Sequence, residues 1–178
     1  MTRRYHPILV VLHWLLALMI IVGLLMGGLS LSETPNDDPA KLTSLMLHMG
    51  SGLAILALMI GRLVARLFTA KPPHADIGND VLNKGASAAH WVFYVLVVVM
   101  CASGIAISQI AGLPDIVFGG SGDPLPATFD NLLPRAVHGI TATLLWLLIG
   151  GHVLAALYHH FVRKDGLLGR MWFGNRNA

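Results

Sequence analysis

The chain has 178 residues, of which 55% are hydrophobic and 12% are charged, and its mean hydropathy is +0.69. This composition leaves too little polar surface for a soluble domain of this size, so we expect an integral membrane protein. The net charge of +3 lies mainly at the ends of the apolar segments, which indicates membrane orientation and not a nucleic-acid-binding surface.

Four apolar segments are long enough to cross a membrane, at about residues 8–29, 42–68, 86–113 and 132–161. The stretches between them, such as SETPNDDPAK and GGSGDPLP, have the composition of loops. Lipid offers no partner for backbone N–H and C=O groups, and these segments lack the alternation of barrel strands, so the segments must be helices. We therefore predict an all-α fold, a four-helix bundle in up-down order in which residues 1–178 form one transmembrane domain.

The first segment follows the basic stretch MTRRYHP and could be mistaken for a secretory signal. A signal has an apolar core of only ~7–15 residues, and this segment is longer, so we expect an uncleaved membrane anchor. The segment carries His13 in the stretch VVLHWLLALMI. An imidazole is costly at this depth unless it is bound to something.

The second segment carries His48 near its start and two basic residues near its end. Arg62 lies 14 residues after His48, on nearly the same helix face, and Arg66 follows one turn later. Both arginines are candidates to bind the propionates of a cofactor such as haem. The alternative is that they extend to the membrane surface and report only orientation.

The third and fourth segments hold three more histidines, His90, His138 and His152. His138 and His152 are 14 residues apart, which places them within ~40° of the same face and ~21 Å apart along the helix. His48 matches the depth of His138, and His13 matches that of His152 within about two turns. Any single one of these histidines could simply bond a neighbouring helix.

Two histidine pairs at two depths predict two sites of axial haem ligation, His48 with His138 and His13 with His152. A haem needs an apolar slot and two facing neutral imidazoles, with small residues to make room for its plane. Close helix packing is the alternative explanation for those small residues. The glycines beside or opposite the histidines are Gly50, Gly52, Gly104, Gly139, Gly150 and Gly151.

The basic residues predict the orientation, because cytoplasmic loops of membrane proteins are enriched in Lys and Arg. Only Lys41 and Arg135 belong to the other side of the predicted bundle, so both termini are expected in the cytoplasm. The ten residues on the cytoplasmic side are Arg3, Arg4, Arg62, Arg66, Lys71, Lys84, Arg163, Lys164, Arg170 and Arg176.

Four motifs together resemble the prokaryotic cytochrome b561 family, and the resemblance covers nearly the whole chain. They are LHW, HMGSG, GRLVAR and HGITATLLWLLIGGHVLAALYHH. The resemblance implies a cytochrome with two b-type haems and four helices in a bacterial inner membrane. It assigns His48 and His138 to the outer haem and His13 and His152 to the inner haem.

An iron with histidine on both faces has no open position for oxygen, so we expect such a protein to transfer electrons. A quinone is the expected acceptor, and the resemblance implies ubiquinone. His159, His160 and His90 are candidates for a quinone or proton site, because histidine exchanges protons near neutral pH. The alternative is that His159 and His160 are interfacial residues of an aromatic and polar belt.

The resemblance also includes a bacterial enzyme that oxidises superoxide on the outer side and passes the electron to ubiquinone. Lys41 and Arg135 would attract such an anion, and they are also candidate partners for the outer propionates. Acidic residues of the same loops would repel superoxide and leave the donor open. These are Glu33, Asp37, Asp38, Asp115, Asp123 and Asp130.

Two other functions remain open at this point. The chain would also suit a cytochrome b subunit that links a partner dehydrogenase or hydrogenase to the quinone pool. A metal transporter would use His48 with Met46 and Met49 for copper, since thioether and imidazole are suitable ligands. A transport path needs further ligands, and no segment carries Asp or Glu in its middle.

Overall fold

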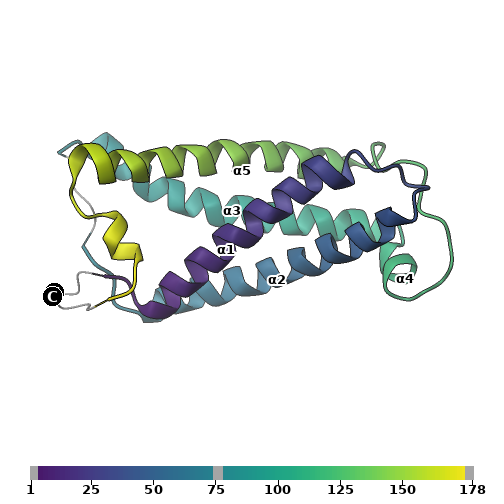
Figure 1. Ribbon diagram of the computed structural model, residues 1–178, viewed down its shortest axis with the longest axis horizontal. Coiled ribbons are helices and arrows are strands. Elements are labelled where there is room, and N and C mark those ends of the chain that lie inside the picture. The colour runs from purple at the N-terminus through teal and green to yellow at the C-terminus, as the bar shows by residue number, and fades with distance from the viewer. Residues whose placement is uncertain (1–3, 74–77, 175–178) are drawn as a thin grey trace.

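The structure is a computed structural model that describes residues 4–73 and 78–174. Four long helices lie side by side along the long axis of the molecule, and no strand occurs within the described ranges (Figure 1). All four are long and apolar enough to cross a membrane. The predicted all-helical fold with four membrane-length helices is therefore confirmed.

Helix α1 spans Pro7–Leu25 and continues into the π-helical turn η1, Met26–Leu31. Its start has Pro7 in the first turn, and the His6 ring accepts a hydrogen bond from the backbone N–H of Ile8. Helix α2 spans Ala40–Phe68. The first span, α1 with η1, therefore ends at Leu31, close to the predicted end at residue 29, and its last turns are π-helical and wider than those of an α-helix.

Helix α3 spans Asp80–Ile110, so it begins and ends earlier than the predicted segment 86–113. At its start the Asn79 side chain accepts a hydrogen bond from the backbone N–H of Val81, which stabilises the first turn. This turn is polar, so the length of the apolar segment did not include it. At its end Gly112 adopts a left-handed φ of 64°, a conformation that favours glycine. The chain then forms the short helix α4, Leu113–Val117.

Helix α5 spans Leu133–Tyr158, with Pro134 in its first turn, where a proline costs no helical hydrogen bond. It continues into the π-helical turn η2, His159–Arg163, and a short 3₁₀ helix, η3, follows at Leu168–Met171. Lys164 between them has a φ of 52°, which reverses the chain direction. Helix α1 packs chiefly against α2, and α3 chiefly against α5.

Large apolar side chains cover the outside of the bundle, as expected for a protein in lipid. Leu18, Leu147 and Leu154 are each more than 60% exposed. A soluble protein rarely exposes so continuous an apolar surface. The interior is a cluster midway along the helices made by Leu16, Ile55, Met59, Tyr94, Val97 and Leu145.

The two ends of the bundle differ in how they are closed. At the end with the start of α1 and η3, here called the terminal end, the Trp14 Nε1–H donates to the Met171 carbonyl at 2.9 Å. The Tyr5 backbone N–H donates to the Arg170 carbonyl at 3.0 Å, so the C-terminal segment is bonded to the start of α1. At the other end, here called the loop end, α4 packs through Leu113 and Val117 against α2 (Figure 1).

Candidate functional site

The loop-end pair consists of His48 on α2 and His138 on α5. Their ring centroids lie 6.1 Å apart with 69° between the ring planes. Glycines of the other two long helical segments approach these rings. A Cβ on Gly104 would lie 3.3 Å from His138 Cε1, and one on Gly27 would lie 3.6 Å from His48 Cε1. Small residues at these positions therefore leave room beside both imidazoles.

Polar contacts fix the orientation of the His138 ring. Its Nδ1 lies 3.0 Å from Ser103 Oγ, and that hydroxyl donates at 2.9 Å to the Met100 carbonyl. Because the hydroxyl proton is used toward Met100, Ser103 accepts from His138 Nδ1–H, and the ring presents Nε2 as its free lone pair. Across the pair, His48 Nδ1 is buried without a hydrogen-bond partner among the described residues.

The terminal-end pair consists of His13 on α1 and His152 on α5. Their ring centroids lie 6.2 Å apart with 65° between the planes. His90 of α3 also lies close to His152, with ring centroids 6.0 Å apart, and its Nδ1 donates to the Ala86 carbonyl at 2.8 Å. The Phe93 ring also contacts His152, at 5.5 Å. This pair therefore lies in a more aromatic and nitrogen-rich surrounding than the loop-end pair.

The ring separations fit the ligation of one metal ion by each pair. A metal–imidazole bond is about 2.0–2.1 Å long and the ring centroid lies about 1 Å further on, so two opposed imidazoles on one ion have centroids about 6 Å apart. The observed separations of 6.1 and 6.2 Å meet this condition at two levels. His90 is at the same distance from His152, so distance alone does not distinguish His13 from His90.

The ligands for a copper path are not assembled in this way. The described residues contain no group of three or more His, Cys, Asp or Glu side chains placed to hold a metal ion. Met46 is 43% exposed on the outside of the bundle, while Met49 packs toward α4. Neither arrangement favours transport of a metal past His48.

Arg62 contacts a tyrosine that the sequence patterns do not single out. Its Nη1 donates to the Tyr94 hydroxyl at 2.6 Å, and its guanidinium carbon lies 5.7 Å from the Tyr94 ring centroid. The Arg62 Nε is buried without a partner among the described atoms. Its charge acts on both His13 and His152. Arg66 lies one turn further along α2 and is partly buried.

Lys41 does not present its charge at the surface as the sequence suggested. It is only 5% exposed, and its ammonium donates to the carbonyls of Leu31 and Thr34 at the end of η1. It therefore stabilises unpaired backbone carbonyls where the first span ends. Arg135 lies along α5, with Nη1 3.4 Å from the position of a Cβ on Gly139.

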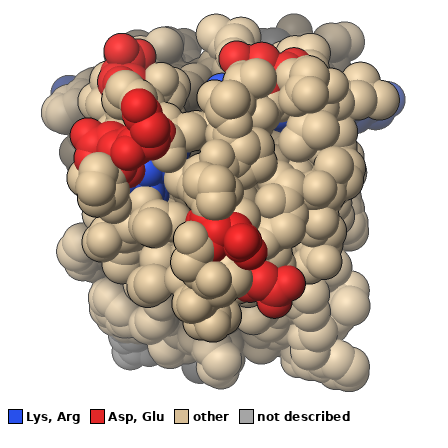
Figure 2. All heavy atoms as spheres, turned by 90° about the vertical axis from the view of Figure 1, so that its right-hand side faces the viewer, with Lys and Arg blue, Asp and Glu red and all other residues tan. Residues whose placement is uncertain are grey.

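The loop end carries an acidic surface, as Figure 2 shows. Basic atoms appear there only in small patches between the acidic groups. A hollow of about 170 Å³ opens at this end between the last residues of α3 and segment 126–132, with Phe129 on its wall. The exposed acidic residues of these loops are Glu33, Asp37, Asp38, Asp115, Asp123 and Asp130.

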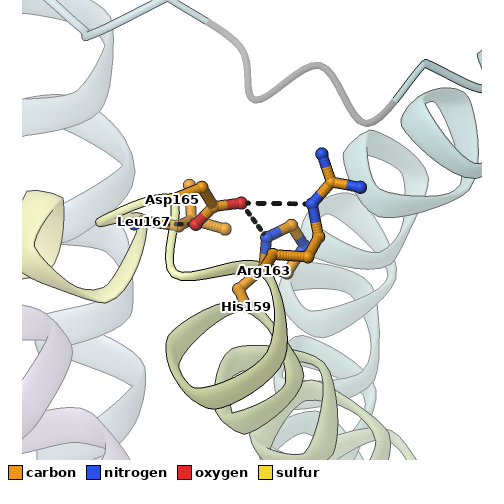
Figure 3. Close-up of polar contacts among 4 residues, drawn as sticks. All are labelled: His159, Arg163, Asp165 and Leu167. Carbon is orange, nitrogen blue, oxygen red and sulfur yellow. Dashed lines mark hydrogen bonds and ion pairs between the residues drawn. The ribbon is translucent and has the colours of Figure 1, made fainter.

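The two histidines that follow α5 separate from each other. His159 hydrogen-bonds through Nδ1 to Asp165, and Arg163 Nε lies 3.4 Å from the same carboxylate oxygen (Figure 3). His160 instead lies against the Phe161 ring, with centroids 4.7 Å apart. Sequence patterns did not identify Asp165, because its link to His159 depends on a single turn of the backbone.

The chain is similar to known proteins along nearly its whole length. Residues 4–174 match the family described as prokaryotic cytochrome b561. The chain is 33% identical to the "probable superoxide oxidase CybB" of Yersinia pestis, over 96% of this chain and 97% of that protein. It is 26% identical to "cytochrome b561 homolog 1" of Escherichia coli K12 (95% and 97% covered) and to "cytochrome b562" of Cereibacter sphaeroides (94% of each).

Proposed function

Because the chain belongs to the prokaryotic cytochrome b561 family, we propose that it carries electrons through two b-type haems from a donor at the loop end to ubiquinone at the terminal end. Membership accounts for a bacterial membrane protein that transfers electrons and binds b-type haem. The observation that carries the finer proposal is the presence of two imidazole pairs, with centroids 6.1 and 6.2 Å apart, at two levels of one bundle.

When bound, two b-type haems would supply one-electron outer-sphere transfer, because each would be held by a pair of imidazoles that leaves no position for oxygen. His48 and His138 would hold one haem, and His13 and His152 the other. Ser103 keeps His138 in the tautomer whose Nε2 is free, and Gly104 leaves room beside that ring.

The terminal-end haem would have its propionates bound by arginine. Arg62 is held by Tyr94 and has a buried Nε with no partner among the described residues, which leaves a donor available. Arg66 is close in sequence and would serve as a second donor. At the loop end Arg135 is the better candidate, since the Lys41 ammonium is already bonded to two carbonyls.

Superoxide is the donor that the similarity to the Yersinia pestis protein suggests, and Arg135, one turn before His138 on α5, is the cation that would attract it. The acidic loop-end surface would oppose the approach of an anion from a distance. The same surface supports a second candidate donor, a partner dehydrogenase or hydrogenase with a basic docking face. The chain would then act as a cytochrome b subunit.

Ubiquinone would be reduced at the terminal end, where His90, His159 and His160 are located. We propose that this end faces the cytoplasm of a bacterial inner membrane, with the helices in up-down order and both termini on that side. This orientation is supported by the basic side chains found at the terminal end. Among the described residues they are Arg4, Arg66, Lys71, Lys84, Arg163, Lys164 and Arg170. Arg3 and Arg176 lie outside the described residues.

The first test is a dithionite-reduced minus oxidised optical spectrum of the purified protein, with haem quantified per chain. We expect b-type bands and two haems per chain. Superoxide and a short-chain ubiquinone would then be added in turn. Reduction by superoxide followed by reoxidation by quinone would identify superoxide, and not a partner protein, as the donor. Absence of haem after expression with ample haem supply would contradict the proposed function and favour metal transport.

A separate test addresses the orientation. Reporter domains that are active only in the cytoplasm or only outside it would be fused after residue 178, and cysteine labels would be placed in the 120–124 loop. We expect a cytoplasmic C-terminus and an accessible loop on the outer side. The opposite labelling pattern would reverse the direction of electron flow that we propose.

A further inference from the structure

The chain turns back on itself directly after α5. The turn η2 ends at Arg163, and Lys164 adopts a φ of 52°, which is uncommon for a residue with a side chain. This reversal returns Asp165 to the side of His159, six residues earlier (Figure 3). The local conformation is therefore one that a simple continuation of the helix would not produce.

Three contacts hold the Asp165 carboxylate in place. Its Oδ2 accepts from His159 Nδ1, and Arg163 Nε lies 3.4 Å from the same oxygen. Its Oδ1 accepts the backbone N–H of Leu167 at 3.1 Å. The carboxylate is therefore oriented by groups on both sides, and it in turn fixes the rotation of the His159 ring.

The protonation state follows from these contacts. Partial burial raises the pKa of Asp165, but the hydrogen bonds from His159 and Leu167 and the charges of His159 and Arg163 outweigh it, so the pKa lies below its usual value. An ionised carboxylate only accepts hydrogen bonds, so His159 Nδ1 must carry a proton. The other nitrogen, Nε2, is then the one that the carboxylate does not engage.

The position of His159 relates it to the terminal-end pair. His159 is the first residue of η2, seven residues after His152, and regular helical geometry places it within ~20° of the same face and ~10 Å further along the axis. Its side chain is 13% exposed, against 32% for Asp165, so the imidazole is the more enclosed member of the dyad. A carrier reduced beside this pair would therefore meet an imidazole whose orientation is already fixed.

We propose that Asp165 is a positioning residue that holds His159 as a proton donor to the quinone reduced at the terminal end. This inference rests on the proposed function. Quinone gains two electrons from the donor oxidised at the loop end and two protons to become quinol. In one protonation the His159 Nε2–H bond breaks as an O–H bond forms on a quinone oxygen. Water at this end then returns a proton to Nε2. The second proton of the quinol comes from water.

The test uses the full-length protein with both haems in liposomes and compares Asp165→Ala and Asp165→Glu with wild type. Dithionite-reduced protein is mixed with a short-chain ubiquinone, and haem reoxidation is followed by stopped flow. We expect Asp165→Ala to slow reoxidation at saturating quinone by about tenfold or more, with half-saturation changed less than about twofold. Asp165→Glu should recover most of the rate, because it restores an anionic acceptor.

The matched control is Asp80→Ala, which removes another exposed carboxylate near the same end. We expect it to reoxidise at the wild-type rate. A second readout does not depend on activity: ¹⁵N NMR of labelled histidine should place the proton on His159 Nδ1 in wild type and lose that preference in Asp165→Ala. An unchanged tautomer, or a rate equal to that of Asp80→Ala, would overturn the proposal.

Failure of the inference is distinguishable from failure of the proposed function. If reduced wild-type protein is not reoxidised by quinone at all, quinone is not the acceptor and both proposals fall. If wild type reacts and Asp165→Ala reacts equally fast, only the role of Asp165 is wrong. If Asp165→Ala loses haem, the isosteric variant Asp165→Asn is tested in its place. We expect Asp165→Asn to retain haem and to be reoxidised by quinone at least about threefold more slowly than wild type.

Discussion

The two imidazole pairs have almost the same ring separation but different surroundings. The loop-end pair is oriented by a serine hydroxyl and approached by Gly27 and Gly104. The terminal-end pair has a third imidazole, His90, an aromatic ring, Phe93, and the charge of Arg62 around it. Equal ring separation therefore does not imply equal chemistry at the two levels.

The difference predicts an order of reduction potentials. A nearby cation stabilises the reduced form of a haem, and nearby carboxylates stabilise the oxidised form. A cation acts on each pair, Arg62 at the terminal end and Arg135 at His138, but the loop end also carries a group of exposed acidic residues. We therefore expect the terminal-end haem to have the higher potential, which favours electron flow from the loop end to the terminal end.

Removal of one ligand from each pair should give the largest effect. His138→Ala should remove only the loop-end haem and His152→Ala only the terminal-end haem, because each ring belongs to a different pair. Haem content per chain should fall from two to one in both variants, as measured by the pyridine haemochrome assay. Loss of both haems, or of neither, in each single variant would contradict the assignment of one haem to each histidine pair.

His13→Ala tests the pairing within the terminal end. Because His90 is as close to His152 as His13 is, the variants His13→Ala and His90→Ala should be compared directly. We expect only His13→Ala to lose the low-spin signal of the terminal-end haem in the electron paramagnetic resonance spectrum, while the signal of the loop-end haem remains. The reverse result would make His90 the ligand.

Neutralisation of Arg62 should have the next largest effect. Arg62→Gln should lower the potential of the terminal-end haem by on the order of 50–100 mV, the Coulomb energy of one charge about 10 Å away in a medium of intermediate dielectric constant. Potentiometric titration would resolve the two haems. Tyr94→Phe keeps the charge and should shift the potential much less, and an equal shift at both haems would argue against a local effect.

Loss of the hydroxyl at Ser103 should act on the loop-end haem alone. Ser103→Ala removes an acceptor from His138 Nδ1–H, so the ring donates less electron density to iron and the potential should rise by a few tens of mV. The free energy of unfolding should fall by about 1 kcal/mol. A shift at the terminal-end haem would contradict this assignment.

The smallest expected effect comes from adding one methyl group beside His138. A Cβ on Gly104 would lie 3.3 Å from the ring, so Gly104→Ala should displace the imidazole by a few tenths of an ångström and slightly shift the loop-end absorption band. Gly85→Ala is the control, since no atom lies within 4 Å of the added carbon and this glycine is not among those beside the histidines. Equal spectra for both variants would show that the glycine is not needed beside the ring.

The sequence alone determined the four membrane-length helices and which histidines share a depth. Both depend on local quantities, because the length of an apolar segment sets whether it spans and the helical period sets which residues share a face. The spacing of His138 and His152 on α5 is of this kind. The start of α3 was predicted too late because capping by Asn79, and not hydropathy, decides where that helix begins.

Only the tertiary structure decided which side chains meet across helices. Arg62 finds Tyr94, and the Lys41 ammonium turns inward to backbone carbonyls, because these contacts depend on how the helices rotate and cross. Asp165 reaches His159 because one residue, Lys164, adopts a left-handed conformation. The spacing of residues along the chain does not contain the information that decides such contacts. Hydrophobic or helical periodicity therefore could not predict them.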